Sequence, residues 1–160
     1  MEERVRSLRG ASWLALLLAG LLVAASRCVP HPVGPGRTYD AYVGKARTTS
    51  EGVRSDVATV SLVAGEMAAN RVFASYVGSV ASESEEAIGG RRSTFASVQP
   101  PDERADAVGE QLGDLIDGAL ADVRDVRVAA RRGDAGAVSD LLGRLEDDRR
   151  ALEDFEASHA

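Results

Sequence analysis

The sequence predicts an all-α protein: an N-terminal membrane-anchor or signal helix, followed by an antiparallel up-down four-helix bundle. Two observations lead to this class. After residue 38, apolar and small residues recur in steps of three and four, the spacing of one face of an α-helix. Clusters of proline, glycine and capping residues divide this stretch into four segments with short connections, which favours antiparallel neighbours. No strand-like alternation competes, and two helical hairpins packed less regularly are the alternative.

The first 27 residues have the pattern of an export signal. Arg4, Arg6 and Arg9 precede sixteen uncharged, mostly apolar residues, 11–26 (ASWLALLLAGLLVAAS). Arginines prefer the cytoplasmic side, so the amino terminus stays in and the rest of the chain is exported. We therefore expect a single-pass protein of the cytoplasmic membrane, with its N-terminus inside and its C-terminal domain outside.

Three fates of this leader, residues 1–27, stay open. Sixteen helical residues cover about 24 Å, short of the roughly 30 Å hydrocarbon core, so the uncleaved signal anchor that we favour spans only marginally. Cleavage after Ser26 would release a secreted protein that begins at Arg27. Lipidation of Cys28 is the third fate, although Arg27 stands where a lipoprotein signal has a small residue.

Residues 28–37 form a linker rich in proline and glycine, and residues 38–160 form the expected extracytoplasmic bundle. Residues 1–27 hold four of the 19 basic and two of the 25 acidic residues, so the remainder has 15 basic and 23 acidic residues and a net charge of −8. This charge disfavours nucleic acid and anionic lipid surfaces as partners. With a single cysteine, the domain depends on packing rather than on an internal disulfide.

The first two expected helices follow the linker. Thr38 is the expected cap of the first, whose apolar stripe runs from Tyr42 to Met67. Gly89 and Gly90 weaken the middle of the second by about 1 kcal/mol each relative to alanine, so we expect it to kink or fray there. To the second helix we assign the stripe Phe73, Tyr76, Val77, Val80, Ala87, Ile88, Phe95 and Val98.

The boundary between the second and third helices is the clearest in the chain. Residues 99–103 (QPPDE) end one helix, because residues before proline avoid the helical region, and begin the next, because proline and acidic residues favour a first turn. The third stripe runs from Ala105 to Ala130. Gly133 is then the expected C′ residue and Asp134 the cap of the fourth helix. The fourth stripe comprises Val138, Leu141, Leu145, Leu152 and Phe155.

No pattern typical of catalysis occurs in the sequence. The two histidines are His31 in the linker and His159 near the C-terminus, so neither a catalytic triad nor the Glu-x-x-His pairs of a ferritin-like metal site can form. A glycine-rich phosphate loop and a CxxC pair are also missing. We therefore predict that the protein is no enzyme, with no catalytic, cofactor-binding or metal-binding residues and no cofactor. Cys28 is the one candidate modification site.

An acidic ribbon on the third helix is the strongest charged feature. It could attract Ca²⁺ or a basic partner, but a solvated face explains it better, because the acids occupy the half of the helix that its dipole favours. Gly109 and Gly113, four residues apart, are interpreted as permitting close approach of another helix. The ribbon consists of Glu103, Asp106, Glu110, Asp114 and Asp117.

The large aromatic residues could line a small-molecule pocket between helices, but core packing is the favoured interpretation. Tyr39 and Tyr42, near the start of the bundle, are better candidates for an exposed or interfacial role, with packing at the base of the bundle as the alternative. The aromatics assigned to the core are Phe73, Tyr76, Phe95 and Phe155.

Two stretches, residues 39–46 (YDAYVGKA) and residues 95–104 (FASVQPPDER), resemble uncharacterised small membrane-anchored or secreted helical proteins of actinobacteria. Eighteen arginines against the single Lys45 agree with a GC-rich genome. The resemblance implies an exported helical domain of unknown role, and it transfers no functional residue to this chain.

Three functions follow as hypotheses. The first is a membrane-tethered interaction or scaffold protein that meets another envelope protein through a face of the bundle. The second is a ligand-sensing bundle that acts with a separate signalling partner, and a polar-centred pocket would favour it, whereas a conspicuous exposed apolar patch would favour scaffolding. The third, a metal-dependent enzyme, needs inward-facing acidic residues on two adjacent helices.

Overall fold

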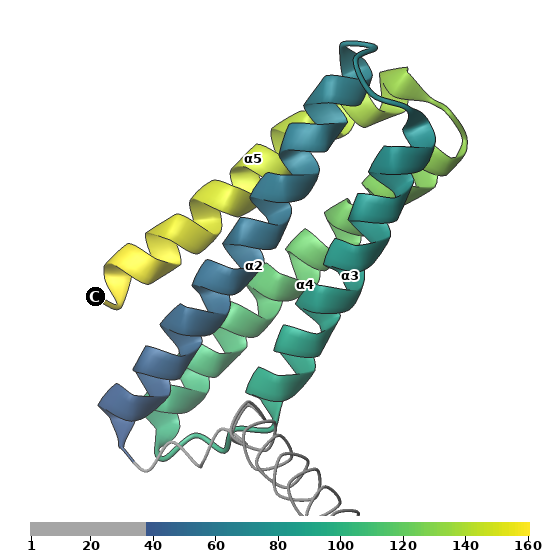
Figure 1. Ribbon diagram of the computed structural model, residues 1–160. Helices are drawn as coiled ribbons and strands as arrows, with labels where there is room; N and C mark the ends of the chain where they lie inside the picture. Colours follow the sequence, from purple (N-terminus) through teal and green to yellow (C-terminus); the bar gives the residue numbers. More distant parts are fainter. Residues whose placement is uncertain (1–37) are drawn as a thin grey trace, which may run out of the picture. The chain divides into compact units, whose positions relative to one another are not determined.

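A computed structural model describes residues 38–160, which are all-helical, without a strand in that range. Four α-helices pack as a bundle in which consecutive helices run antiparallel (Figure 1). The fold class predicted for this part of the chain is confirmed. The leader and the linker lie outside the described residues. The helices are α2 (Tyr39–Ala68), α3 (Ala74–Ala96), α4 (Glu103–Arg131) and α5 (Ala135–Ser158).

Three of the helices begin at capping side chains. The Thr38 hydroxyl accepts a hydrogen bond from the Ala41 amide at 3.2 Å, and Asp102 does the same for the Ala105 amide at 3.0 Å. Asp134 caps α5 through the Ala137 amide at 2.9 Å. These bonds satisfy amides that have no partner within the first turn of a helix. The predicted caps Thr38 and Asp134 are therefore confirmed.

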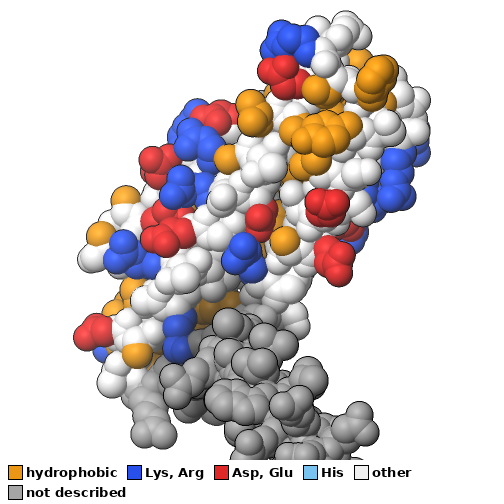
Figure 2. All heavy atoms as spheres, viewed as in Figure 1, with side chains coloured by type: hydrophobic (Ala, Val, Ile, Leu, Met, Phe, Trp, Pro, Cys, Tyr) orange, Lys and Arg blue, Asp and Glu red, His pale blue; other side chains and the backbone are white. Residues whose placement is uncertain are grey.

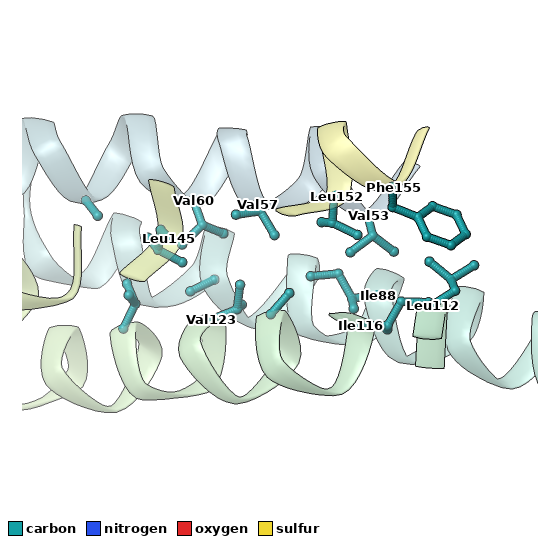
Figure 3. Packing of buried hydrophobic residues seen from close by; sticks show 14 of the residues in the cluster. Val53, Val57, Val60, Ile88, Leu112, Ile116, Val123, Leu145, Leu152 and Phe155 are labelled. Carbon is teal, nitrogen blue, oxygen red and sulfur yellow. The ribbon is translucent and has the colours of Figure 1, made fainter. Parts of the chain in front are cut away.

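Each helix packs against two neighbours, in the cyclic order α2, α3, α4, α5, and α2 also reaches α4 across the centre. Apolar side chains from all four helices meet along this axis (Figure 3). Val53, Val57 and Val60 of α2 are fully buried there, opposite larger side chains such as Ile116 of α4 and Leu152 of α5. The alternation of small and large residues fills the space between closely packed helices.

The apolar stripe predicted for α3 is wrong at its N-terminal end. Phe73 is 86% exposed and Tyr76 is 54% exposed, so the predicted core positions of both residues are wrong. The buried face of α3 instead passes through Ala81 and Ser84, whose small side chains give a weak hydropathy signal, before reaching Ile88. The predicted residues Val77, Ile88 and Phe95 are buried, so the prediction fails only at the start of the helix, where it follows large residues onto the exposed face.

The expected disruption at Gly89 and Gly90 is not observed, because α3 runs as one helix from Ala74 to Ala96. Packing on both sides, against α2 and α4, offsets the low helix propensity of these two residues. Among helices α2 to α5, none combines the length and the apolar character that a membrane span requires.

Candidate functional site

The end of the bundle at which α2 passes into α3 carries an apolar surface. The tip patch, as we name it, consists of Leu62, Phe73 and Tyr76, which are 66%, 86% and 54% exposed. Figure 2 shows hydrophobic side chains gathered on the surface at this end, over α2 and α3. Large apolar side chains gain nothing from such exposure in a monomer, so the patch is a candidate interaction surface.

The turn between α2 and α3 holds the tip patch in place. Asn70 adopts a left-handed backbone conformation, with φ of 57°, and the Arg71 amide donates to the Glu66 carbonyl at 2.8 Å. The Arg71 and Glu66 side chains form a two-pronged ion pair at 2.5 and 2.7 Å. This pairing lowers the pKa of Glu66. Phe73 occupies the N-cap position of α3 and supplies no capping hydrogen bond, so its ring is presented outward.

A second polar feature lies between α4 and α5, where two carboxyl groups face each other. Asp122 is only 7% exposed, and its carboxylate accepts a hydrogen bond from the Arg144 guanidinium. Arg144 also pairs with Asp125 at 3.2 Å. The Oδ2 atom of Asp148 is buried and finds no hydrogen-bond donor among the described residues. We call Asp122 and Asp148 the carboxyl pair.

Burial and the negative charge of Asp122 together raise the pKa of Asp148 from 3.8 to about 7. A proton on Asp148 lets it donate to Asp122, which removes the repulsion between two carboxylates. Arg144 opposes this shift, but its guanidinium is already engaged by Asp122 and Asp125. The contact between α4 and α5 therefore takes up a proton near neutral pH.

The carboxyl pair was not predicted, although the sequence contains its signal. Asp122 falls between Ala119 and Val126 on the apolar stripe of α4. Asp148 falls between Leu145 and Leu152 on the stripe of α5, again at steps of three and four. An acidic residue at a core position of each of two adjacent helices is the arrangement that the metal-enzyme hypothesis required. In helices α2 to α5, however, no three metal-ligating side chains come together.

Ion pairs elsewhere in the bundle are better satisfied than the carboxyl pair. Glu85 of α3 accepts hydrogen bonds from Arg127 at 2.5 Å and Arg124 at 3.1 Å, both on α4. These contacts, chiefly the bond from Arg127, lower the pKa of Glu85. On the opposite side, the buried Ser50 hydroxyl reaches both the Leu152 carbonyl and the Glu156 carboxylate. Such contacts fix the register between neighbouring helices.

At the other end of α3, a groove of about 470 Å³ opens between α3 and α4. Tyr42 and Phe95 form part of its wall, with ring centroids 5.4 Å apart. Gly109 leaves room for the Tyr42 hydroxyl and Gly113 for the Arg92 guanidinium, because a Cβ at either position would crowd them. The expected close approach at these glycines therefore involves two side chains rather than the backbone of another helix. We call this feature the α3–α4 groove.

The structure places the other candidate residues as follows. All five acids of the predicted ribbon on α4 are exposed, which agrees with a solvated face. Asp106, Glu110 and Asp114 also border the α3–α4 groove.

The predicted positions of the aromatic residues are confirmed in part. Phe95 and Phe155 are buried, as predicted. Tyr42 is buried at the base of the bundle rather than exposed. The ring of His159 lies 4.4 Å from that of Phe155, while Cys28 and His31 lie outside the described residues.

The fold and these features define a helical bundle with an exposed apolar tip and a buried carboxyl pair. Comparison of the chain with protein-family models, with curated proteins and with solved structures finds no match. The resemblance to exported actinobacterial proteins therefore stays a prediction. Arguments about function depend on the chemistry of the tip patch, the carboxyl pair and the α3–α4 groove.

Proposed function

We propose that this chain is a membrane-tethered, extracytoplasmic interaction protein that binds another envelope protein through the tip patch. The single observation that carries the proposal is the exposure of Leu62, Phe73 and Tyr76 at one end of the bundle. A few residues supply most of the binding energy of a protein interface, and aromatic side chains such as tyrosine are enriched among them. The predicted scaffold role is the hypothesis that an exposed apolar patch favours.

The position of the tip patch also supports a tethered role. Helix α2 has 30 residues, so its two ends lie about 45 Å apart. Thr38 begins α2 at one end of the bundle, and the tip patch lies toward the other end of that helix. If the leader stays in the membrane, most of the length of α2 separates the start of the bundle from the patch. A partner can then reach the patch. A cleaved leader would give a secreted protein with the same binding surface.

Affinity purification of the full-length, tagged chain from its own cells tests the tip patch. We expect one partner to copurify with the wild type and to be lost from the variant Leu62→Ser/Phe73→Ser/Tyr76→Ser. The matched control replaces exposed charged residues near the same end of the bundle, Arg132→Ser and Asp140→Ser, and should retain the partner. If the patch variant keeps the same partner in the same amount, the proposal is wrong.

Fractionation of the native membranes tests the tether separately. We expect the chain to stay in the membrane fraction at its full mass after washing with salt and carbonate. A soluble species that begins near Arg27 would favour the secreted alternative, and a diacylglyceryl mass on Cys28 would favour the lipoprotein.

A ligand-sensing bundle that works with a separate signalling partner is the second candidate. The observation that favours it is the α3–α4 groove, in which an aromatic wall is combined with charged side chains. Its volume falls within the range of small-molecule sites, roughly 300–1,000 Å³. The tip patch and the groove lie toward opposite ends of α3, so the two roles do not compete for one surface.

A further inference from the structure

The polar contacts between α5 and α2 lie near the C-terminal end of α5. The buried Ser50 hydroxyl donates to the Leu152 carbonyl at 3.3 Å, and Arg54 pairs with Glu156 at 3.1 Å. Glu156 lies about two turns beyond Asp148 on α5, so the α2 cation that reaches α5 is engaged away from the carboxyl pair. Helix α5 is therefore fastened to α2 by contacts that do not involve the carboxyl pair.

The contact between α4 and α5, which we call the α4–α5 seam, is built differently. Among residues 38–160, each ion pair between these two helices involves Arg144, which binds Asp122 and, at 3.2 Å, Asp125. A groove of about 450 Å³ opens along the seam, and Asp125 and Arg144 are among its lining residues. The fully buried side chains that the N-terminal half of α5 contributes are Val138 and Leu145. Because the seam is incompletely filled, a change of charge within it can alter the contact.

The carboxyl pair supplies such a change of charge. The charged groups that face Asp148 are Asp122 on α4 and, on α5 itself, Arg144 and Asp147. A proton on Asp148 lets it donate to Asp122, and its pKa of about 7 means that this proton is lost near neutral pH. Two carboxylates then face each other in the seam, where Arg144 is already engaged and Asp147 adds further negative charge.

We propose that the carboxyl pair is a proton-controlled latch between α4 and α5. With a proton on Asp148 the two helices stay in contact, and without it α5 moves away from α4 at this level while it keeps its contacts with α2. Water then enters the seam and solvates both carboxylates, which lowers the cost of their charge. Opening also uncovers the apolar part of the groove, formed by Val128, Ala129 and Leu141. The latch is independent of the tip patch.

Pulsed electron double resonance on the full-length protein in a non-ionic detergent measures the movement. All variants carry Cys28→Ser, which removes the one native cysteine, so that only introduced cysteines take spin labels. Labels on Ala121→Cys and Gly143→Cys span α4 and α5, and labels on Ala58→Cys and Gly143→Cys span α2 and α5. All three labelled positions are exposed.

We expect the α4–α5 distance to gain a longer component between pH 5 and pH 8. The ratio of the longer to the shorter component should rise at least about tenfold, because each unit by which the closed seam raises the pKa of Asp148 is worth a factor of ten. Asp148→Asn keeps a donor for Asp122 and has no proton to lose, so it should show the short distance at both pH values. The control Asp154→Asn removes an exposed carboxylate from α5 and should respond to pH as the wild type does.

Three results would overturn the inference. An α4–α5 distance that is the same at pH 5 and pH 8 in the wild type would mean that the seam does not respond to the proton. Equal lengthening in Asp148→Asn would mean that another group titrates. A parallel change in the α2–α5 distance would mean that the whole bundle loosens. None of these results affects copurification through the tip patch, so failure of the latch is distinguishable from failure of the interaction role.

Discussion

The two turns at one end of the bundle are built in different ways. Residues 132–134 join α4 to α5 with Gly133 in the left-handed conformation, at φ of 69°, and with Asp134 as a hydrogen-bonded cap. Residues 69–73 join α2 to α3 with Asn70 in the left-handed conformation and with Phe73 at the capping position, where it forms no capping bond. The first turn follows the rules for a stable helix connection, and the second departs from them.

The difference indicates where stability was not the main constraint. A local sequence that contradicts its own structural context is expected at functional positions, because function selects residues that folding alone would not. Phe73 weakens the start of α3 and also exposes an aromatic ring. The turn between α4 and α5 exposes no large apolar side chain. The comparison therefore separates a structural turn from a turn that we assign to binding.

The largest expected effect comes from converting Phe73 into a capping residue. Phe73→Asp should weaken partner binding at least about tenfold, because it replaces an exposed aromatic anchor with a charge. The same change should raise the free energy of unfolding by about 0.5–1 kcal/mol, since Asp at the N-cap accepts from the amides of the first turn. Quantitative copurification and thermal melts of the variant measure the two effects. If Phe73→Asp lowers the free energy of unfolding and keeps partner binding, Phe73 serves stability rather than binding, and our assignment is wrong.

The next effect concerns the carboxyl pair, which lies between α4 and α5, the two helices that the structural turn at residues 132–134 connects. The folded pKa of Asp148, about 7, lies above its ordinary value of 3.8, so its stabilising contribution is complete below about pH 4 and is lost as the pH rises toward 7. If the whole pKa shift of Asp148 acted on the free energy of unfolding, it would contribute about 4 kcal/mol. Because Asp148 is only half-buried, screening by solvent reduces this contribution to about 1–2 kcal/mol.

Asp148→Asn should therefore flatten the dependence of unfolding free energy on pH between about pH 4 and 7, and should be more stable than the wild type at neutral pH. Denaturant unfolding at a series of pH values measures this difference. Asp154→Asn, an exposed change on the same helix, serves as the control. A wild-type profile that shows no fall over this range would contradict the carboxyl pair.

Removing the cap of the structural turn should have a somewhat smaller effect. Asp134→Ala leaves the Ala137 amide without its 2.9 Å hydrogen bond, so the free energy of unfolding should fall by about 1 kcal/mol. Partner binding should be unaffected, because this turn lies outside the tip patch. Chemical denaturation and copurification of one preparation check both statements, and weaker binding at unchanged stability would contradict them.

The smallest effect is expected at Asn70. Asn70→Gly relieves the left-handed strain but loosens the unfolded chain, so the two contributions nearly cancel and stability should change by no more than about 0.5 kcal/mol. Gly133→Ala offers the opposite test, because it places a Cβ in the same conformation and should cost about 1 kcal/mol. If both substitutions change the free energy of unfolding by the same amount, the two turns do not differ in the way that we describe.

Local signals predicted most of this fold. Thr38, Gly133 and Asp134 act through their own backbone or through amides three residues away, so their roles can be inferred from sequence alone. The packed face of α3 could not be inferred in the same way. It includes Ala81 and Ser84, which are buried by their position between α2 and α4 rather than by their hydropathy.

The candidate sites depend on contacts between helices, which the sequence does not specify directly. Asp122 and Asp148 are 26 residues apart and meet only because α4 and α5 pack in one register. The Tyr42 hydroxyl reaches the α3–α4 groove because Gly109 lacks a side chain on another helix. The sequence does not predict the tip patch for a simpler reason: Phe73 and Tyr76 stand at a helical spacing that is typical of core residues, whereas Phe73 precedes α3 and Tyr76 lies on its exposed face.

Site-specific photo-crosslinking in living cells tests the central claim most directly. A photoreactive phenylalanine replaces Phe73 in one strain and Arg132, which is exposed at the other turn, in a second strain. The interaction role predicts one discrete adduct from position 73, at the combined mass of this chain and a different envelope protein, and no such adduct from position 132. Identical adducts from both positions, no adduct from position 73, or an adduct at twice the mass of the chain would contradict it.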